Sequence, residues 1–430
     1  MGVKYDVIVI GSGAGGLFAA ARLSRAGYRV LVIEKLPFLG GRFSSIVHEG
    51  FTFTTGATSV ECGGIVEQTF SEVGARFDVR RPSPPVRYRI GGRDYDMPEK
   101  GWLRFLLSVV NDEQKDTDRI LSGFGKALTE EPSPSLSVKG WLAQYTENER
   151  VLAIFQCMCG AICSANSYEL PMVEYLKLVR TRGYTSFGLH PNGNKALVGS
   201  LADVVTSKGG EVWTRSKVTQ ILVNDGVVRG VAVQRDDREL ETDAPFVVSD
   251  VGPAETVELA CRENFGSDYL EMIGKIKTVC SLLLEIISDR PLVDFPGIIM
   301  TPGMRRLAFI LSPTMSCPEL APKGKHITTV LGVPAHSDPL DLRGEFDAIM
   351  EDARENIPGF DEYKDHLLMR SFHGAWPGHR ALAGTDMRPE TPVANLYNVG
   401  DGVQGSGHFG LGRCAAAAKA VAEAIERGSK

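Results

Sequence analysis

A glycine-rich turn directly follows a short apolar segment near the start of the chain. Residues 7–16 read Val-Ile-Val-Ile-Gly-Ser-Gly-Ala-Gly-Gly, which gives Gly11, Gly13 and Gly16 the spacing G-x-G-x-x-G. Glycine is abundant here, with 47 residues among 430, so the spacing alone has little specificity. Its context is more specific, because β-branched residues predict a strand before the turn and residues 17–26 predict a helix after it.

A second predicted strand, over residues 29–33, ends in Glu34. Strand, glycine turn, helix and a strand with a terminal acidic residue form the βαβ unit that binds a dinucleotide. In such a unit the diphosphate lies on the helix N-terminus, and the acidic side chain accepts hydrogen bonds from the adenosine ribose. The contacts predicted in the turn are Gly11, Gly13, Ala14, Gly15 and Gly16.

The residues after Glu34 indicate which dinucleotide is bound. Lys35 is followed by Leu-Pro-Phe-Leu and then by Gly40-Gly41-Arg42, where backbone N–H groups and a cation suit a diphosphate. This arrangement resembles the flavin-containing amine oxidase and phytoene desaturase superfamily, in which such a turn wraps an FAD. NAD-dependent dehydrogenases have no such requirement after their acidic residue. The resemblance therefore implies FAD as the cofactor.

The same resemblance implies further cofactor contacts. Residues 50–58 are similar to the segment by which the family brings backbone beside the flavin ring, although Thr54 and Ala57 stand where the family more usually has an acidic residue and a proline. The segment around Val218 resembles the second FAD-binding segment, whose valine touches the adenine through its backbone. Together with the turn after Glu34, these segments imply cofactor contacts at Lys35, Gly41, Arg42, Gly56, Ala57, Thr58 and Val218.

The C-terminal part of the chain carries a second glycine-rich turn. A predicted strand over residues 395–400 ends at Gly400, Asp401 follows it, and a helix is predicted over residues 413–427. A carboxylate in this place can hold the ribityl hydroxyls, and a helix that begins under the flavin stabilises the anionic reduced ring. This segment resembles the closing Gly-Asp motif of the family, which implies contacts at Gly400, Asp401, Gly410 and Leu411.

The resemblance covers nearly the whole chain and implies an α/β fold. It implies a Rossmann-like FAD-binding domain, with the two-domain architecture of the p-hydroxybenzoate hydroxylase/glutathione reductase type, and an inserted α+β substrate domain. Changes in residue pattern place the FAD-binding domain at residues 1–82, 190–262 and 393–430. The substrate domain is expected at residues 83–189 and 263–392.

Composition excludes several functional classes. A hydrophobic content of 43% with a mean hydropathy of −0.06 is ordinary for a soluble globular protein. The net charge of −6 offers no basic surface, so nucleic acid is not an expected partner. No segment approaches the roughly 18 apolar residues of a spanning helix. No signal-peptide pattern precedes the first strand, so the expected location is cytoplasmic.

The apolar segment at residues 102–110 leaves contact with a membrane open. Family members that handle very lipophilic substrates dip such a segment into a membrane surface, whereas most runs of this length are core helices. A cytoplasmic protein that associates peripherally with a membrane is therefore one expectation. A homodimer is a second open expectation for the assembly.

The eight cysteines are scattered, and only Cys157, Cys159 and Cys163 lie close together. Their apolar neighbours predict core thiols on a buried helix. No Cys/His pair stands nearby to complete a zinc site, so no metal site is predicted. A redox or iron–sulfur role is the alternative.

Three residues are candidates for contact with the substrate. His408 stands between the glycines that touch the flavin, where family desaturases carry a proline, so it is a candidate proton acceptor or hydrogen-bond donor. A structural histidine in the turn is the alternative. Trp376 belongs to a polar and aromatic segment before the final strand, for which a solvated loop is the alternative. Tyr184 borders the return into the cofactor domain.

The Gly-Asp motif, with glycine-rich sequence after it, resembles the phytoene desaturase and carotenoid isomerase branch of the superfamily. The resemblance implies an FAD-dependent oxidoreductase that desaturates or isomerises an apolar, unsaturated, isoprenoid- or polyene-like substrate. No second dinucleotide turn stands between a predicted strand and helix, so the expected electron acceptor is dioxygen, a quinone or another bound acceptor. The alternatives are a flavin amine oxidase and a prenyl-binding protein similar to the Rab GDP-dissociation inhibitors.

Overall fold

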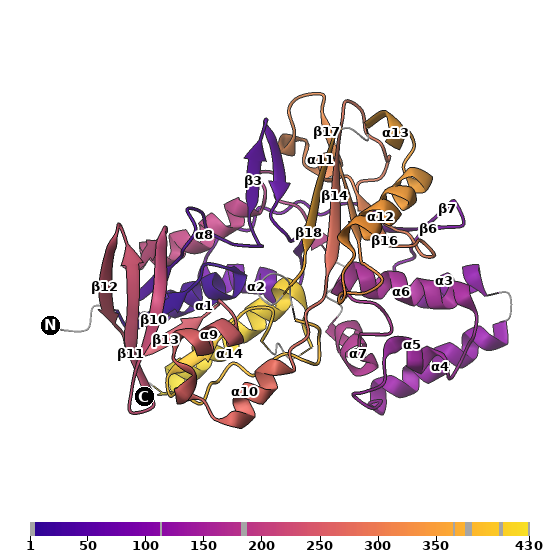
Figure 1. Ribbon diagram of the computed structural model, residues 1–430. Helices are drawn as coiled ribbons and strands as arrows, with labels where there is room; N and C mark the ends of the chain where they lie inside the picture. The colour runs from indigo at the N-terminus through magenta and orange to yellow at the C-terminus, as the bar shows by residue number, and fades with distance from the viewer. Residues whose placement is uncertain are drawn as a thin grey trace. The chain divides into compact units, whose positions relative to one another are not determined.

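The computed structural model describes residues 5–111, 114–181, 187–363, 366–374, 381–403 and 407–428. The chain divides into two compact units, each built from separate stretches of sequence (Figure 1). Unit 1 comprises Met1–Val79, His190–Lys277 and Thr385–Lys430. Unit 2 comprises Arg80–Leu189 and Thr278–Gly384.

The largest difference from the predicted boundaries is the segment at residues 263–277, which lies in unit 1. It contains α10 (Ser267–Gly274), and Phe265 and Tyr269 are buried in the hydrophobic core of that unit. The Tyr269 hydroxyl also accepts a hydrogen bond of 3.2 Å from Asn398 Nδ2. Residues 385–392 likewise belong to unit 1 and not to the predicted substrate domain.

Unit 1 is built on a five-stranded parallel sheet with the strand order β19-β13-β1-β2-β9. Two of these strands, β1 and β2, consist of four apolar residues each and are buried on both faces, as is typical of parallel sheets. Their alternate side chains therefore supply two separate cores. The strands are β1 (Val7–Ile10), β2 (Val30–Ile33), β9 (Glu211–Trp213), β13 (Phe246–Ser249) and β19 (Leu396–Asn398).

Helices cover one face of this sheet, and a small antiparallel sheet covers the other. Val7 and Val9 of β1 face the helical layer, in which α1 and α14 lie side by side, whereas Ile8 and Ile10 face the antiparallel sheet (Figure 1). The layers contain α1 (Ala14–Arg25), α2 (Ile65–Val73), α8 (Asn194–Ser207), α14 (Gly410–Gly428), β10 (Ser216–Asn224), β11 (Val227–Arg235), β12 (Arg238–Asp243) and α9 (Pro253–Leu259). The Rossmann-like α/β architecture expected from the sequence is confirmed.

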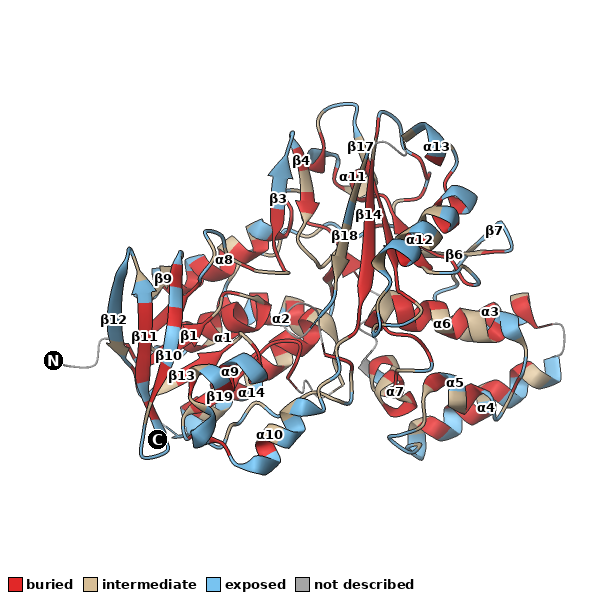
Figure 2. Ribbon diagram, in the orientation of Figure 1, coloured by how far each residue is buried: buried red, intermediate tan, exposed pale blue. Residues whose placement is uncertain are grey.

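Several element boundaries in unit 1 differ from the prediction. The helix expected from residue 17 begins at Ala14, and the helix expected from residue 413 begins at Gly410. Strand β12 was not predicted, because four of its six residues are charged and most of them are exposed (Figure 2). Unit 1 also contains β3 (Ser45–His48), β4 (Phe51–Thr54) and β5 (Val60–Glu61).

Unit 2 contains a seven-stranded mixed sheet with the strand order β18-β14-β17-β16-β15-β6-β7. Strand β14 is buried along nearly its whole length, as Figure 2 shows. Alternate β14 residues, Leu282, Leu284 and Ile286, pack in one core with Ile349 and Ala353 of α12. The strands are β6 (Val86–Ile90), β7 (Arg93–Asp96), β14 (Ser281–Ser288), β15 (Ile298–Met300), β16 (Leu307–Leu311), β17 (His326–Gly332) and β18 (Leu367–Phe372).

The remaining elements of unit 2 are mainly helical. Only one face of α3 is buried, through Leu106, Leu107 and Val110. Within the described residues, no helix has the length and hydropathy needed to cross a membrane. The elements are β8 (Phe187–Gly188), α3 (Trp102–Val110), α4 (Gln114–Thr129), α5 (Val138–Leu142), α6 (Glu149–Cys163), α7 (Met172–Thr181), α11 (Pro313–Ser316), α12 (Leu342–Asn356) and α13 (Phe360–Tyr363).

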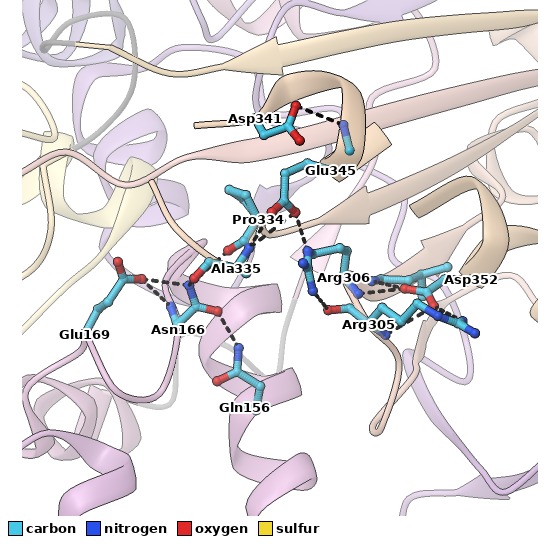
Figure 3. Close-up of polar contacts among 12 residues, drawn as sticks. Gln156, Asn166, Glu169, Arg305, Arg306, Pro334, Ala335, Asp341, Glu345 and Asp352 are labelled. Atoms are coloured by element: carbon cyan, nitrogen blue, oxygen red, sulfur yellow. Dashed lines mark hydrogen bonds and ion pairs between the residues drawn. The ribbon is translucent and has the colours of Figure 1, made fainter. Parts of the chain in front are cut away.

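A buried carboxylate joins α12 to the start of β16 (Figure 3). Asp352 is fully buried and accepts hydrogen bonds from the backbone N–H groups of Arg305, Arg306 and Leu307 at 3.1, 2.6 and 3.0 Å. The Arg305 guanidinium adds a fourth bond of 2.9 Å. Because three backbone donors end on one side chain, Asp352 fixes how the β16 strand begins.

The three clustered cysteines lie on α6, where each is buried and none forms a disulfide bond within the described residues. The Cys157 thiol donates to the backbone carbonyl of Ala308 in β16 at 3.1 Å. Burial raises the pKa of Cys157 to about 12, so the thiol is un-ionised. The prediction of core thiols on a buried helix is confirmed.

Candidate cofactor site

Three glycines of the turn in unit 1 have no room for a side chain, because other protein atoms lie where a Cβ would be. A Cβ on Gly15 would lie 2.5 Å from the backbone nitrogen of Gly400 and 2.7 Å from Oδ1 of Asp250. A Cβ on Gly13 would come closer than 3.0 Å to Oδ2 of Asp250, and one on Gly16 would equally overlap the Gly11 carbonyl. The glycines are therefore needed for contacts between three chain segments, in addition to any contact with a ligand.

Glu34 at the end of β2 is buried and anchored to the same turn. Its Oε2 accepts hydrogen bonds from the N–H and the hydroxyl of Ser12 at 2.9 and 2.7 Å, and its Oε1 accepts from the N–H of Leu36 at 2.8 Å. A carboxylate offers about four acceptor positions, and three hydrogen bonds reach this one from the described residues. Glu34 thus keeps capacity for one ribose hydroxyl. The sequence interpretation did not include Ser12.

The turn at Gly40-Gly41-Arg42 is joined to residues 55–57 by a series of hydrogen bonds. The Thr55 hydroxyl donates to the Gly41 carbonyl at 2.7 Å, and the Ala57 N–H donates to the Arg42 carbonyl at 3.0 Å. A Cβ on Gly56 would lie 2.5 Å from that carbonyl. Two of the segments assigned to the cofactor are therefore held side by side by one side-chain and one backbone hydrogen bond.

Arg42 and Asp401 form a bidentate ion pair. Nη1 and Nη2 of Arg42 donate to Oδ2 and Oδ1 of Asp401 at 2.9 and 2.8 Å, across 359 positions of sequence. Burial lowers the Arg42 pKa, but the charge and hydrogen bonds of Asp401 outweigh it, so the pKa is raised overall. The prediction gave these residues separate roles, on the diphosphate and on the ribityl chain, and did not include their contact.

The turn before α14 carries His408. This side chain is half-buried, and its backbone carbonyl accepts a hydrogen bond of 3.3 Å from Nε of Arg413. Burial, and after it the charge of Arg413, lowers the pKa of the His408 imidazole. Arg413 itself is buried, where it pairs with Asp386 at 3.5 Å. His408 is therefore placed beside the N-terminus of α14 in its neutral form.

Asp250 is a site residue that the sequence interpretation missed. It follows β13, and its N–H donates to the Ile10 carbonyl at 2.8 Å, so its side chain lies at the glycine turn. Oδ2 is buried and has no hydrogen-bond partner within the described residues. The available signal was its position directly after a buried parallel strand, where ligand-binding residues gather in open α/β sheets.

The other predicted residues are less informative. Val218 is buried in β10, close to Ser216, whose N–H donates to the Glu34 carbonyl at 2.9 Å. Lys35 is exposed, and Thr58 is partly exposed. Trp376 and Tyr184, the other two candidate substrate contacts, lie outside the described residues.

The donor set fits a dinucleotide better than a metal ion. The site offers the N-terminus of α1, an acidic residue with acceptor capacity at the end of the second strand, and the Arg42 guanidinium, which is paired with Asp401. Across the described ranges, no group of three His, Cys, Asp or Glu side chains could hold a metal ion.

Comparison with known proteins assigns the family. A model described as flavin containing amine oxidoreductase matches residues 14–426. An uncharacterized protein of Methanocaldococcus jannaschii is 28% identical over 409 residues, which are 93% of this chain and 94% of that protein. The chloroplastic prolycopene isomerase of Daucus carota is 24% identical over 379 residues, 75% of this chain but only 60% of the isomerase.

The solved structure of an oxidoreductase from Methanosarcina mazei has the same fold. Its TM-score is 0.87 at 30% sequence identity, and the match covers 97% of this chain and 100% of that one. Relatives with the names prolycopene isomerase and phytoene desaturase identify the branch. The chain belongs to the flavin-containing amine oxidoreductase family, in its phytoene desaturase and carotenoid isomerase-like branch, and is an oxidoreductase with FAD as cofactor.

Proposed function

We propose that this oxidoreductase desaturates or isomerises an apolar, unsaturated, isoprenoid- or polyene-like substrate. The proposal is supported by similarity to the carotenoid enzymes over most of the chain. The observation that best supports flavin-dependent redox chemistry is the ion pair of Arg42 and Asp401 beside the glycine turn, since both residues suit a bound flavin dinucleotide. It argues against the prenyl-binding alternative, in which FAD is not used.

In this proposal each part of unit 1 holds one part of FAD. Glu34 and Val218 bind the adenosine end, and the glycine turn and Arg42 bind the diphosphate. Asp401 binds the ribityl hydroxyls, and the N-terminus of α14 faces the flavin ring, where its positive end favours negative charge. When bound, FAD accepts a hydride from the substrate.

The chemistry that remains for the protein is the handling of one proton. Desaturation removes a hydride and a proton from adjacent carbons, leaves a C=C bond, and requires dioxygen, a quinone or another acceptor to take the two electrons afterwards. Isomerisation returns the hydride, so no net acceptor is needed. His408 is the proposed proton acceptor, because burial keeps its imidazole neutral. The activity of a His408→Gln variant should then lose the acid limb of the pH profile.

The test begins with purified protein that shows the flavin absorption band at about 450 nm. A cis-configured polyene, presented anaerobically in detergent, is expected to bleach this band if it is desaturated. If it is isomerised, the polyene spectrum changes while the flavin band stays. Putrescine serves as the amine control. Bleaching by the amine, with no change in either spectrum on adding polyenes, would replace the proposal by the amine oxidase alternative.

A further inference from the structure

The carboxyl group of Asp250 occupies the centre of the glycine turn. The Cβ positions of Gly13 and Gly15 lie 2.4 and 2.7 Å from Asp250 carboxyl oxygens, and that of Gly16 lies 3.2 Å from Oδ2. The Asp250 backbone carbonyl lies 3.4 Å from the Cβ position of Gly11. All four glycines of the turn therefore contact this one residue. A carboxyl group at this place is next to the N-terminus of α1, where a diphosphate binds in the βαβ unit.

The hydrogen bonds of Asp250 leave one oxygen unused. The Gly16 backbone supplies a hydrogen bond to the carboxyl group. Oδ2, by contrast, is buried and has no partner within the described residues. A buried oxygen without a partner is costly, and such a group in a native structure indicates a missing ligand atom, water or proton.

The surrounding charges disfavour a carboxylate at this position. Two other acidic side chains, Glu34 and Asp401, face Asp250, and one cation, Arg42, is already paired with Asp401. A bound diphosphate adds further negative charge to the same turn. Among the described residues, Glu34, Arg42, Asp401 and Cys414 interact electrostatically with Asp250, and Glu61 with Cys414. Arg413 donates to the Asp401 backbone carbonyl and is paired with Asp386.

Burial, together with Asp401 and Glu34, raises the pKa of Asp250 well above its usual value, against the effect of the Gly16 hydrogen bond and Arg42. The un-ionised carboxyl group has an O–H to donate, and a phosphate oxygen is the acceptor that a dinucleotide brings to this turn.

We propose that Asp250 is a cofactor-binding residue that stays in the carboxylic acid form and donates a hydrogen bond from Oδ2 to a phosphate oxygen of FAD. In this form it neither repels the diphosphate nor leaves a buried oxygen without a partner. The inference depends on the FAD cofactor and not on the identity of the substrate, so failure of the polyene assay leaves it standing.

Three variants separate the donor from the charge and from the packing. Asp250→Asn keeps the shape and an N–H donor, whereas Asp250→Leu keeps the branched shape and the number of heavy atoms without a donor. Asp243→Asn is the matched control, because it removes one exposed carboxylate from the same unit. The measurement is the FAD dissociation constant of deflavinated protein, from isothermal titration calorimetry.

We expect Asp250→Asn and Asp243→Asn to bind FAD within about threefold of the wild type, and Asp250→Leu to lose tenfold or more. Wild-type affinity in Asp250→Leu would overturn the proposal, because packing alone would then explain the residue. An equal loss in Asp250→Asn would overturn it too, because an ionised acceptor would then be required.

Infrared difference spectra read the protonation state directly and do not depend on enzyme activity. The FAD-bound wild type should show the C=O stretch of a carboxylic acid that is missing from FAD-bound Asp250→Asn. Addition of FAD to the wild-type apoprotein should shift this band, since a hydrogen bond forms. If the spectra of the two FAD-bound proteins do not differ in this region, Asp250 is ionised and the proposal fails.

Discussion

The ion pair between Arg42 and Asp401 should stabilise unit 1 even without the cofactor. The perturbation is a double-mutant cycle with Arg42→Met, Asp401→Asn and the combined variant. Exposed ion pairs contribute about 0.2–1 kcal/mol, and removal of one partner of a fully buried pair costs about 3–5 kcal/mol. The Arg42 side chain is 30% exposed and that of Asp401 10%. The pair lies between these limits, so we expect a coupling energy of about 2 kcal/mol.

The assay is urea unfolding of the apoprotein, followed by far-ultraviolet circular dichroism. Arg229→Met with Asp243→Asn provides the matched control, because this pair has a contact of 3.1 Å but side chains that are 48% and 61% exposed. Its coupling energy should not exceed about 0.5 kcal/mol. Equal coupling in the two cycles would refute the reasoning from burial. In the holoprotein, Asp401→Ala should release FAD, and full occupancy in that variant would contradict its assigned role.

Three further predictions concern other parts of the chain. Gly15→Ala places a Cβ 2.5 Å from a backbone nitrogen and should weaken FAD binding at least tenfold, whereas Gly199→Ala, with open space around it, should bind normally in the same titration. Asp352→Ala leaves three backbone N–H groups without their acceptor, that of Leu307 buried, and should cost about 3–5 kcal/mol in urea unfolding; a loss below about 1 kcal/mol would mean that water replaces the carboxylate. Burial raises the pKa of Glu285 from 4.5 to about 7, against the attraction of Arg370. The native state therefore holds this proton more tightly than the unfolded state, and wild-type stability should fall as pH rises from 4.5 to about 7. Stability of the Glu285→Gln variant should not fall in this way. If the urea midpoints of the wild type and the variant change equally between pH 5 and pH 8, the prediction is wrong.

The sequence predicted the fold because the strongest signals were local. The strand at Val7–Ile10, the turn and the second strand up to Glu34 are adjacent in sequence, and each pattern matched one element. Boundaries failed where tertiary packing decided them. Residues 263–277 join unit 1 because Phe265, Tyr269, Ile273 and Ile276 pack on its sheet, and this helical spacing was visible but not specific to either unit.

The contacts within the candidate site were beyond sequence reasoning. Glycine, acidic and basic residues were assigned to the cofactor one by one, each on its local pattern. The pairing of Arg42 with Asp401 depends on where β19 joins the sheet, 359 positions later. The position of Asp250 depends in the same way on β13 lying parallel to β1. Long-range strand order has no local signature in a single sequence.

The glycines of the turn are explained by two requirements that act together. A ligand that binds at the α1 N-terminus requires close backbone approach, and Gly13 meets this requirement. Yet the Cβ positions of Gly13 and Gly15 already overlap with Asp250, so an alanine at either position would displace protein atoms before any cofactor arrived. The turn and the end of β13 must therefore change together. A substitution that adds a side chain to the turn should be tolerated only when the residue at position 250 becomes smaller. Gly13→Ala alone should therefore lower the stability of the apoprotein. The double variant Gly13→Ala with Asp250→Gly should restore it.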